Sequence, residues 1–286
     1  MVRAIRLGIA ALVVGAIVAG IWEMSASHQP GSAAIVSGFY LSETILAGIL
    51  ILLGSLVEGY GYGLSLGTQW PYTRNILVLM VQGDPEAAHR VVATLVGVIA
   101  VVLAVLSPAS ATLNGLVLVI ITALLGIGTL HVLSGRMPSF VHGIHGLLAY
   151  GVFLCYLSGL LLPGIKFWFY LGIMGVLHPL LLTVFLGGMT TGQRGFGKPI
   201  EPFYWPRRAA QWTFAIHLLS ALAVVATLGW YMPAYPIAFY LAVGQIAVGF
   251  LLFHAVNLKP KAPGLIAAFH QCMVIAITVT IVLASR

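Results

Sequence analysis

A short polar stretch at the start of an apolar segment brings together three groups that could do chemistry. Asp84–Arg90 reads D-P-E-A-A-H-R and contains a carboxylate at Glu86, an imidazole at His89 and a guanidinium at Arg90. Glu86 and His89 are three residues apart, so on a helix they share a face. Ionisable groups are costly in apolar surroundings and usually have a function there. This stretch is therefore the candidate centre of a functional site.

Six histidines recur at the ends of apolar segments, in the same order in two halves of the chain. Each half has one near the start of a helix, one at the end of a later helix and one in the first turns of the next. In chain order they are His89, His131, His145, His217, His254 and His270. This order predicts an internal duplication. It also places all six imidazoles on one side of the membrane, together with the long loops 58–87 and 191–209.

Histidines on two facing helices of a four-helix unit can supply both axial ligands of a haem. His89 with His145 forms such a pair in the first half, and His217 with His270 forms one in the second. A ligating nitrogen must be neutral, which suits apolar surroundings. Zinc fits less well, because it prefers a tight cluster with cysteine or carboxylate. The simpler alternative is that each histidine only hydrogen-bonds a neighbouring helix.

Three further histidines are candidates for supporting roles. His142 is a rival to His145, since both stand near a helix start in V-H-G-I-H-G. His142 lies a turn nearer the loop and could bond a propionate or the loop instead, so we favour His145 as the ligand. His131 and His254 end their helices and could support the ligands or replace them.

Haem propionates need cations as partners. Candidates on the histidine side of the membrane are Arg90, Arg136, Arg207, Arg208 and Lys259. We expect this group to contain the propionate-binding residues.

The two halves differ around their first histidine. Glu86 and Arg90 flank His89, whereas the positions matching them around His217 are Phe214 and Leu218. This difference predicts that the first site does chemistry and that the second carries electrons. Glu86 could then take protons or stabilise a developing cation. The alternative is that Glu86 and Arg90 form an interfacial ion pair.

The composition identifies a polytopic membrane protein. Of the 286 residues, 60% are hydrophobic and only 7% are charged, against about 25% charged in a soluble domain. The net charge of +7 is too scattered for a nucleic-acid surface. Cys155 and Cys272 lie far apart inside apolar segments, so neither a disulfide nor a CxxC metal site is indicated.

A membrane span needs about 20 apolar residues, and nine segments qualify. They are 5–22, 38–57, 88–107, 111–133, 139–162, 167–190, 210–230, 235–257 and 263–283. We expect an all-α fold with an anchor helix and a polar linker over 1–37. Two four-helix bundles related by a pseudo-twofold axis then follow, over 38–165 and 166–286.

Two polar groups inside predicted spans have no place in this scheme. His178 is expected deep in its helix, bonding the carbonyls freed by a kink at Pro179. Together with Glu43 it could instead line a transport path. A transporter is therefore one alternative to a haem protein, and a di-haem b electron-transfer subunit without catalysis is another.

The chain resembles the haem A synthase family, membrane enzymes that convert haem O to haem A for terminal oxidases. The resemblance covers about residues 38–286 and rests on the E-x-x-H-R element, the Gly-rich run before it, and the later histidines of both halves. The residues concerned are Glu86, His89, Arg90, Gly54–Gly63, Trp70, Pro71, His145, His217 and His270. Unlike many members, this chain has no Cys pair in its first long loop, has Gln69 where Asp is usual, and has an extra N-terminal helix.

The resemblance implies a haem O substrate held by His89 and His145, a haem b held by His217 and His270, and Glu86 as the essential carboxylate. It implies stepwise oxidation of a haem methyl group to formyl, giving haem A, with electrons leaving through haem b to a quinone or a redox partner. The implied setting is the cell membrane, with a haem O synthase or a terminal oxidase as partners. We also expect a homo-oligomer. Helix faces with small residues, at Gly172, Gly175, Gly187 and Gly188, permit close packing against a helix of the same chain or of another copy.

The orientation in the membrane stays open at this stage. Cations gather on the histidine side, which by the positive-inside rule would face the cytoplasm. The family resemblance implies the opposite orientation. Cations that bind propionates, or a first segment that does not span, would reconcile the two.

Overall fold

The computed structural model describes most of the chain and consists of helices. The described residues are 2–26, 31–70, 75–164, 175–195, 197–260 and 263–286, without the side chains of 2–6. Within these residues there is no strand. The helices are α1 (Val2–Ala26), α2 (Ser32–Tyr60), α3 (Ile76–Gln82), α4 (Pro85–Leu106), α5 (Ser110–Leu133), α6 (Phe140–Leu161), α8 (Leu177–Arg194), α9 (Ala209–Trp230), α10 (Pro236–Leu258) and α11 (Gly264–Ala284).

Eight of the described helices are long and apolar enough to cross a membrane. They are α1 from Leu7 onward, α2, α4, α5, α6, α9, α10 and α11. The protein is therefore an all-α, multi-pass membrane protein, as its composition predicts. The span expected at 167–190 falls partly outside the described residues, and α8, which ends it, is only 18 residues long.

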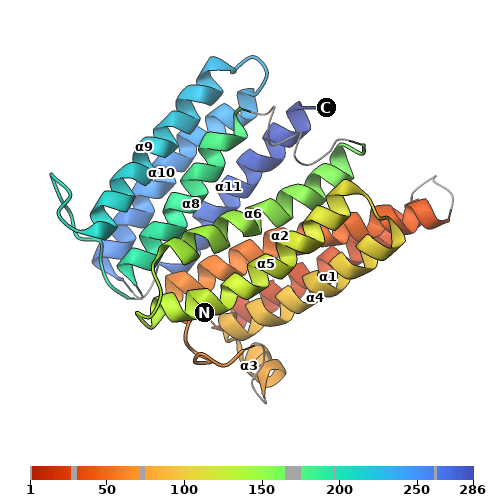
Figure 1. Ribbon diagram of the computed structural model, residues 1–286, viewed down its shortest axis with the longest axis horizontal. Helices are drawn as coiled ribbons and strands as arrows, with labels where there is room; N and C mark the ends of the chain where they lie inside the picture. The colour runs from red at the N-terminus through yellow and green to blue at the C-terminus, as the bar shows by residue number, and fades with distance from the viewer. Residues whose placement is uncertain (1, 27–30, 71–74, 165–174, 196, 261–262) are drawn as a thin grey trace.

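The helix contacts follow the order of the internal repeat. In the first half α2 packs on α4 and α6, and α5 packs on the same two helices. In the second half α9 packs on α8 and α10, and α10 packs on α11. Between the halves, α6 lies against α8 and α11 lies against α2, as can be followed in Figure 1. A twofold rotation that carries α2 onto α8 and α6 onto α11 would carry the α11–α2 contact onto the α6–α8 contact.

The polar linker predicted over residues 23–37 is largely helical instead. Helix α1 continues to Ala26, and α2 already begins at Ser32. The Ser37 hydroxyl donates to Glu23 Oε1 at 2.9 Å, so polar groups of the two helices satisfy one another. Gly20 and Gly38 let the backbones touch, since a Cβ at Gly20 would lie 2.7 Å from the Gly38 carbonyl oxygen. The sequence pattern was misleading because small polar residues here mark a helix contact rather than a loop.

The start of α4 is fixed by its capping residue. The Asp84 carboxylate accepts from the backbone N–H groups of Glu86 and Ala87 at 2.8 and 3.0 Å. Pro85 occupies the first helical position, where a missing N–H costs nothing. The helix therefore begins three residues before the predicted span, and Glu86 lies in its first turn.

The expectation for His178 was wrong. Helix α8 begins at Leu177, so His178 lies in its first turn and is exposed. Pro179 there needs no kink, because a proline in the first turn removes no intrahelical bond. The Pro179 carbonyl accepts from the Thr183 hydroxyl rather than from a histidine.

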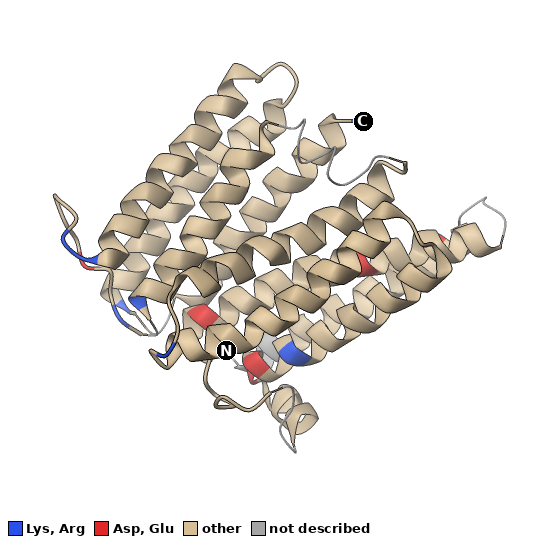
Figure 2. Cartoon of the chain, viewed as in Figure 1, with Lys and Arg blue, Asp and Glu red and all other residues tan. Residues whose placement is uncertain are grey.

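Charged residues are concentrated at one end of the helices. Figure 2 shows most of the coloured segments along the left and lower edges of the view, in the loop before α9, near the start of α6 and near the start of α4. This is also the end at which the repeated histidines lie.

Candidate functional site

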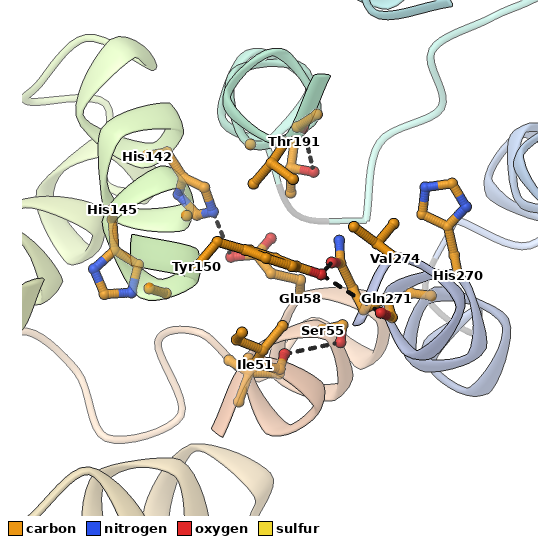
Figure 3. Close-up of a pocket in the computed structure, with 18 of the residues that line it drawn as sticks. Ile51, Ser55, Glu58, His142, His145, Tyr150, Thr191, His270, Gln271 and Val274 are labelled. Atoms are coloured by element: carbon orange, nitrogen blue, oxygen red, sulfur yellow. Dashed lines mark hydrogen bonds and ion pairs between the residues drawn. The ribbon is translucent and has the colours of Figure 1, made fainter. Parts of the chain in front are cut away.

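One large cavity lies between the two halves of the protein. Its volume is about 760 Å³, and residues of α2, α4, α5, α6, α8, α9, α10 and α11 line it. Most of the wall is apolar, which is typical of pockets for small molecules and cofactors. The four histidines predicted as ligands all line it, and they are His89, His145, His217 and His270. Residues from both sides of the cavity are shown in Figure 3.

Each of these four rings lies against a glycine of a neighbouring helix. The separation between the ring atom Cε1 and a Cβ built on the glycine is 3.2 to 3.6 Å in every case. The pairs are His89 with Gly54, His145 with Gly126, His217 with Gly187, and His270 with Gly249. A larger residue would compete with the ring for this space, so the glycines fix where each imidazole can lie.

Two of the rings have their Nδ1 atoms held by backbone carbonyls. His145 Nδ1 is 3.0 Å from the Thr122 oxygen, and His217 Nδ1 is 2.9 Å from the Thr183 oxygen. A carbonyl can only accept, so Nδ1 carries the proton and Nε2 keeps a free lone pair. Metal-binding histidines usually have their second nitrogen held in this way. Each threonine stands four residues before the glycine that its histidine contacts, one helical turn away.

The other two rings depart from this pattern. His270 Nδ1 is 3.0 Å from the side-chain amide of Gln245, which again stands four residues before the contacted glycine. The same amide nitrogen donates to the His270 carbonyl at 2.9 Å. His89 Nδ1 is buried, and its backbone neighbour is the Leu50 carbonyl, in a contact weaker than a full hydrogen bond. Leu50 again stands four residues before the contacted glycine, so the position of the partner is repeated at all four rings.

The second histidine pair has the separation that a shared metal ion requires. The ring centres of His217 and His270 are 6.5 Å apart, with the ring planes at 52°. Two metal–nitrogen bonds of about 2 Å each put the nitrogens roughly 4 Å apart, and the ring centres roughly 6 Å apart. The pair thus fits an ion bound axially between two imidazoles.

The described residues contain no group of three or more His, Cys, Asp or Glu that could hold a metal ion. A metal bound here would need a group with its own ligands, such as the macrocycle of a haem. The apolar cavity and the two histidine pairs fit such a group.

His142 lies in different surroundings from His145. Its Nε2 is 3.1 Å from Glu58 Oε1, an interaction drawn in Figure 3, and the side chain is buried. The geometry therefore supports His145 as the ligand and gives His142 a partner on α2. Neither His131 nor His254 is among the described residues that line the cavity.

Glu86 and Arg90 form a buried ion pair at the mouth of the cavity. Arg90 Nη2 lies 2.5 Å from Glu86 Oε1, and the two residues are 8% and 4% exposed. The other carboxylate oxygen accepts from the Ser65 hydroxyl at 2.9 Å and from Leu66 N–H at 3.1 Å. Arg90 also donates to the Gln69 carbonyl. Both residues line the cavity, and together they hold the loop after α2 against α4.

The cations predicted to bind propionates differ in whether they line the cavity. Arg90 lines the cavity, whereas Arg136, Arg207 and Arg208 are exposed and are not among its described lining residues. Arg208 instead pairs with Glu201 at 2.5 Å on the surface.

Sequence reasoning missed Arg194 as a candidate site residue. Arg194 is buried at the end of α8, lines the cavity and donates to the Lys198 carbonyl at 3.0 Å. It stands seven residues after Gly187, and that spacing puts the two on one face of a helix. This spacing was the signal that could have identified it.

The two halves are joined by a hydrogen bond inside the cavity. The Tyr150 hydroxyl on α6 donates to Gln271 Oε1 on α11 at 2.7 Å. Figure 3 shows Tyr150 between His145 and the Gln271–His270 segment. This bond links the walls of the two histidine sites.

The described part of the small-residue faces packs within the chain. A Cβ on Gly188 would lie 3.0 Å from the backbone of Gly143 on α6, and Gly187 faces His217. Gly175 has open space around it, and Gly172 lies outside the described residues.

Comparisons with protein-family models, with curated proteins and with solved structures found no match to this chain.

Proposed function

We propose that this protein is a haem A synthase-like membrane oxidoreductase. In this proposal His89 and His145 hold haem O in the first half, and His217 and His270 hold haem b in the second. The observation that supports it best is the repeated arrangement of four histidines around one cavity, each ring against a glycine. Such repetition is not expected of histidines that merely bond neighbouring helices.

The difference between the halves supports a division of labour. At the first site a buried carboxylate and a guanidinium line the cavity, next to the histidine on the same helix. At the second site the position equivalent to Glu86 is Phe214, which stacks on Phe253 with ring centres 4.6 Å apart. Among the described residues that line the cavity, a carboxylate on the same helix as a predicted ligand histidine thus occurs only at the first pair. An apolar wall beside the second pair suits electron transfer without proton chemistry.

The chain's residues have distinct tasks in this reaction. When bound, the haem iron supplies the redox chemistry. Glu86 would accept protons from the methyl group undergoing oxidation, or stabilise positive charge that develops there. Arg90 holds the carboxylate in place through a charge-assisted hydrogen bond. With water as the oxygen source, conversion of a methyl to a formyl group releases four electrons and four protons. The electrons need an acceptor such as a quinone or a redox partner.

The setting of the protein forms part of the proposal. Haem A is a cofactor of terminal oxidases, so the protein would act in the cell membrane during cytochrome oxidase assembly. A haem O synthase would supply the substrate, and the terminal oxidase would receive the product.

The proposal is tested by the haems that the protein contains and makes. The chain is expressed with a haem O source, and the extracted haems are separated by chromatography. Wild type should give haem b together with haem O and its hydroxylated or formyl products. Glu86→Gln should keep haem b but lose the oxidised products. An oxidised product that persists in Glu86→Gln would contradict the role of Glu86.

A second candidate is a di-haem b subunit that only transfers electrons. It is favoured by one observation, namely that both oxygens of Glu86 already have partners in Arg90, Ser65 and Leu66. A carboxylate engaged in this way could simply hold the loop. Haem b at two per chain, no haem O product and unchanged electron transfer in Glu86→Gln would establish this function instead.

A further inference from the structure

Glu43 is a fully buried carboxyl group that the proposed function does not use. It stands in the middle of α2, is 0% exposed, and neither side-chain oxygen has a hydrogen-bond partner among the described residues. Gly54, which contacts His89, is eleven residues further along the helix, about 16 Å away. An acidic side chain at the centre of a membrane helix is costly. Such a group usually persists because it has a function.

Two tyrosines complete a cluster around this carboxyl group. Tyr156 on α6 is 0% exposed, its hydroxyl has no hydrogen-bond partner among the described residues, and it lies close enough to interact electrostatically with Glu43. The ring of Tyr40, one turn before Glu43, has its centre 6.3 Å from that of Tyr156. A Cβ on Gly115 would lie 2.8 Å from the Tyr156 hydroxyl, so a glycine makes room for this group. Cys155 is the other titratable neighbour of the two tyrosines.

The cluster lies between two cavities. On one side, Ala47 is one turn from Glu43 and Val152 is one turn from Tyr156, and both line the large cavity. On the other side, Tyr40 lines a second cavity of about 330 Å³ at the opposite ends of the helices. Ser32, Ser37 and Ser107 share that wall, so the second cavity offers hydroxyl groups to water.

We propose that Glu43, with Tyr156 and Tyr40, is a proton-exchange site between the large cavity and the membrane face opposite the histidines. A carboxylate without a partner is unfavourable in this apolar core, so the group carries a proton at rest. The proton leaves through the Tyr156 and Tyr40 hydroxyls to water in the second cavity. A proton from the large cavity then replaces it. This assignment goes beyond the proposed function and holds whether or not the cavity binds haem.

The first test is chemical labelling with dicyclohexylcarbodiimide, an apolar reagent that adds to protonated carboxyl groups. The adduct rearranges to a stable N-acylurea without loss of any atom, and peptide mass spectrometry locates it. In the full-length protein in lipid nanodiscs we expect label on Glu43 and none on the ion-paired Glu86. Glu43→Gln should lose the label. Failure of Glu43 to react would overturn the proposal.

Infrared spectroscopy supplies an independent test that does not depend on access of the reagent. The difference between wild type and Glu43→Gln should contain the carbonyl band of a protonated carboxylic acid. This band should shift in D₂O as the proton exchanges. Carboxylate bands in its place would show an ionised group, which would contradict the proposal.

The route is tested by the rate of that exchange. Tyr156→Phe and Tyr40→Phe should each slow the D₂O shift of the Glu43 band by about tenfold or more, because each removes a proton carrier. Tyr240→Phe, an exposed position on α10, is the matched control and should exchange like wild type. Equal rates in all four proteins would exclude the tyrosines from the route. Glu86→Gln should leave the rate unchanged, which separates this site from the proposed catalytic one.

Discussion

His217 is held by Thr183 through the backbone, with its Nδ1 atom 2.9 Å from the Thr183 carbonyl oxygen. The next turn of the same helix carries Gly187, against which the ring lies. One helix thus sets both the protonation and the position of an imidazole on another. The same device recurs at His145, where the Thr122 carbonyl stands four residues before Gly126. At His270 the residue four positions before the glycine is Gln245, whose amide nitrogen donates and therefore favours the proton on Nε2 instead.

The glycine contacts predict a graded response to added methyl groups. A Cβ at Gly187 would lie 3.2 Å from His217 Cε1, whereas at Gly249 it would lie an ordinary 3.6 Å from His270 Cε1. Overpacking costs about 1–3 kcal/mol, so Gly187→Ala should weaken haem binding at the second site by about tenfold. Gly249→Ala should bind almost normally. Haem content and the visible spectrum of the purified variants measure this, and Gly244→Ala on α10 is the control. Equal losses in Gly187→Ala and Gly249→Ala would contradict the role given to the closer contact.

The buried ion pair predicts a large loss of stability when one partner is removed. Arg90→Met leaves the Glu86 carboxylate buried without its cation, which should cost about 3–5 kcal/mol of unfolding free energy. The double variant Glu86→Gln with Arg90→Met should recover part of that loss. Thermal unfolding in detergent measures both.

Arg208→Met is the matched control for this experiment. Its partner Glu201 is also an acidic residue, but the two side chains are 63% and 45% exposed. Exposed pairs contribute about 1 kcal/mol or less, so this variant should unfold like wild type. A similar loss in Arg90→Met and Arg208→Met would show that burial does not decide the effect.

The choice between His142 and His145 is tested by replacing each with alanine. His145→Ala should lose the haem of the first half, because its Nε2 has the free lone pair that a ligand needs. His142→Ala should keep that haem and should instead remove the contact of His142 with Glu58. Haem stoichiometry per chain and the low-temperature spectrum of each variant measure the result. Retention of haem in His145→Ala and its loss in His142→Ala would reverse the assignment.

Gln245 should tune the second haem through His270. Gln245→Leu removes an amide N–H that favours the proton on Nε2, so haem binding through Nε2 should be retained or strengthened. Gln245→Glu offers a carboxylate to Nδ1–H and makes the imidazole a stronger donor. It should therefore shift the midpoint potential to lower values in a redox titration. A potential unchanged in both variants would exclude Gln245 from this role.

The sequence predicted the elements of the site better than the contacts that hold them. The repeated order of histidines was readable because helix ends are marked by glycine, proline and loop residues. Gln245 was missed because a single glutamine within an apolar helix has no signal apart from its spacing to Gly249. The propionate partners were chosen by side of the membrane alone. The structure places Arg136 on the surface and Arg194 at the cavity, and sequence alone does not give such distances.

The N-terminal region shows the same limit in another form. Ser32 and Ser37 have the composition of a loop, but both lie in α2. Unpaired backbone groups are too costly in a membrane, which favours helix over loop in such a segment. His178 was assigned to the interior of a span because the start of α8 is not marked by a capping residue. In both cases local composition was a weaker guide than the surroundings of the backbone.

If the two halves are repeats, the seams between them, α6 on α8 and α11 on α2, are one interface that occurs twice. That would be the geometry of an isologous dimer, in which the same surface of each subunit meets the other's. The internal duplication expected from the sequence would then make the chain the counterpart of two subunits joined end to end. In such a chain each half could change without changing the other. Glu86 in the first half and Phe214 at the matching position of the second half would be one such change.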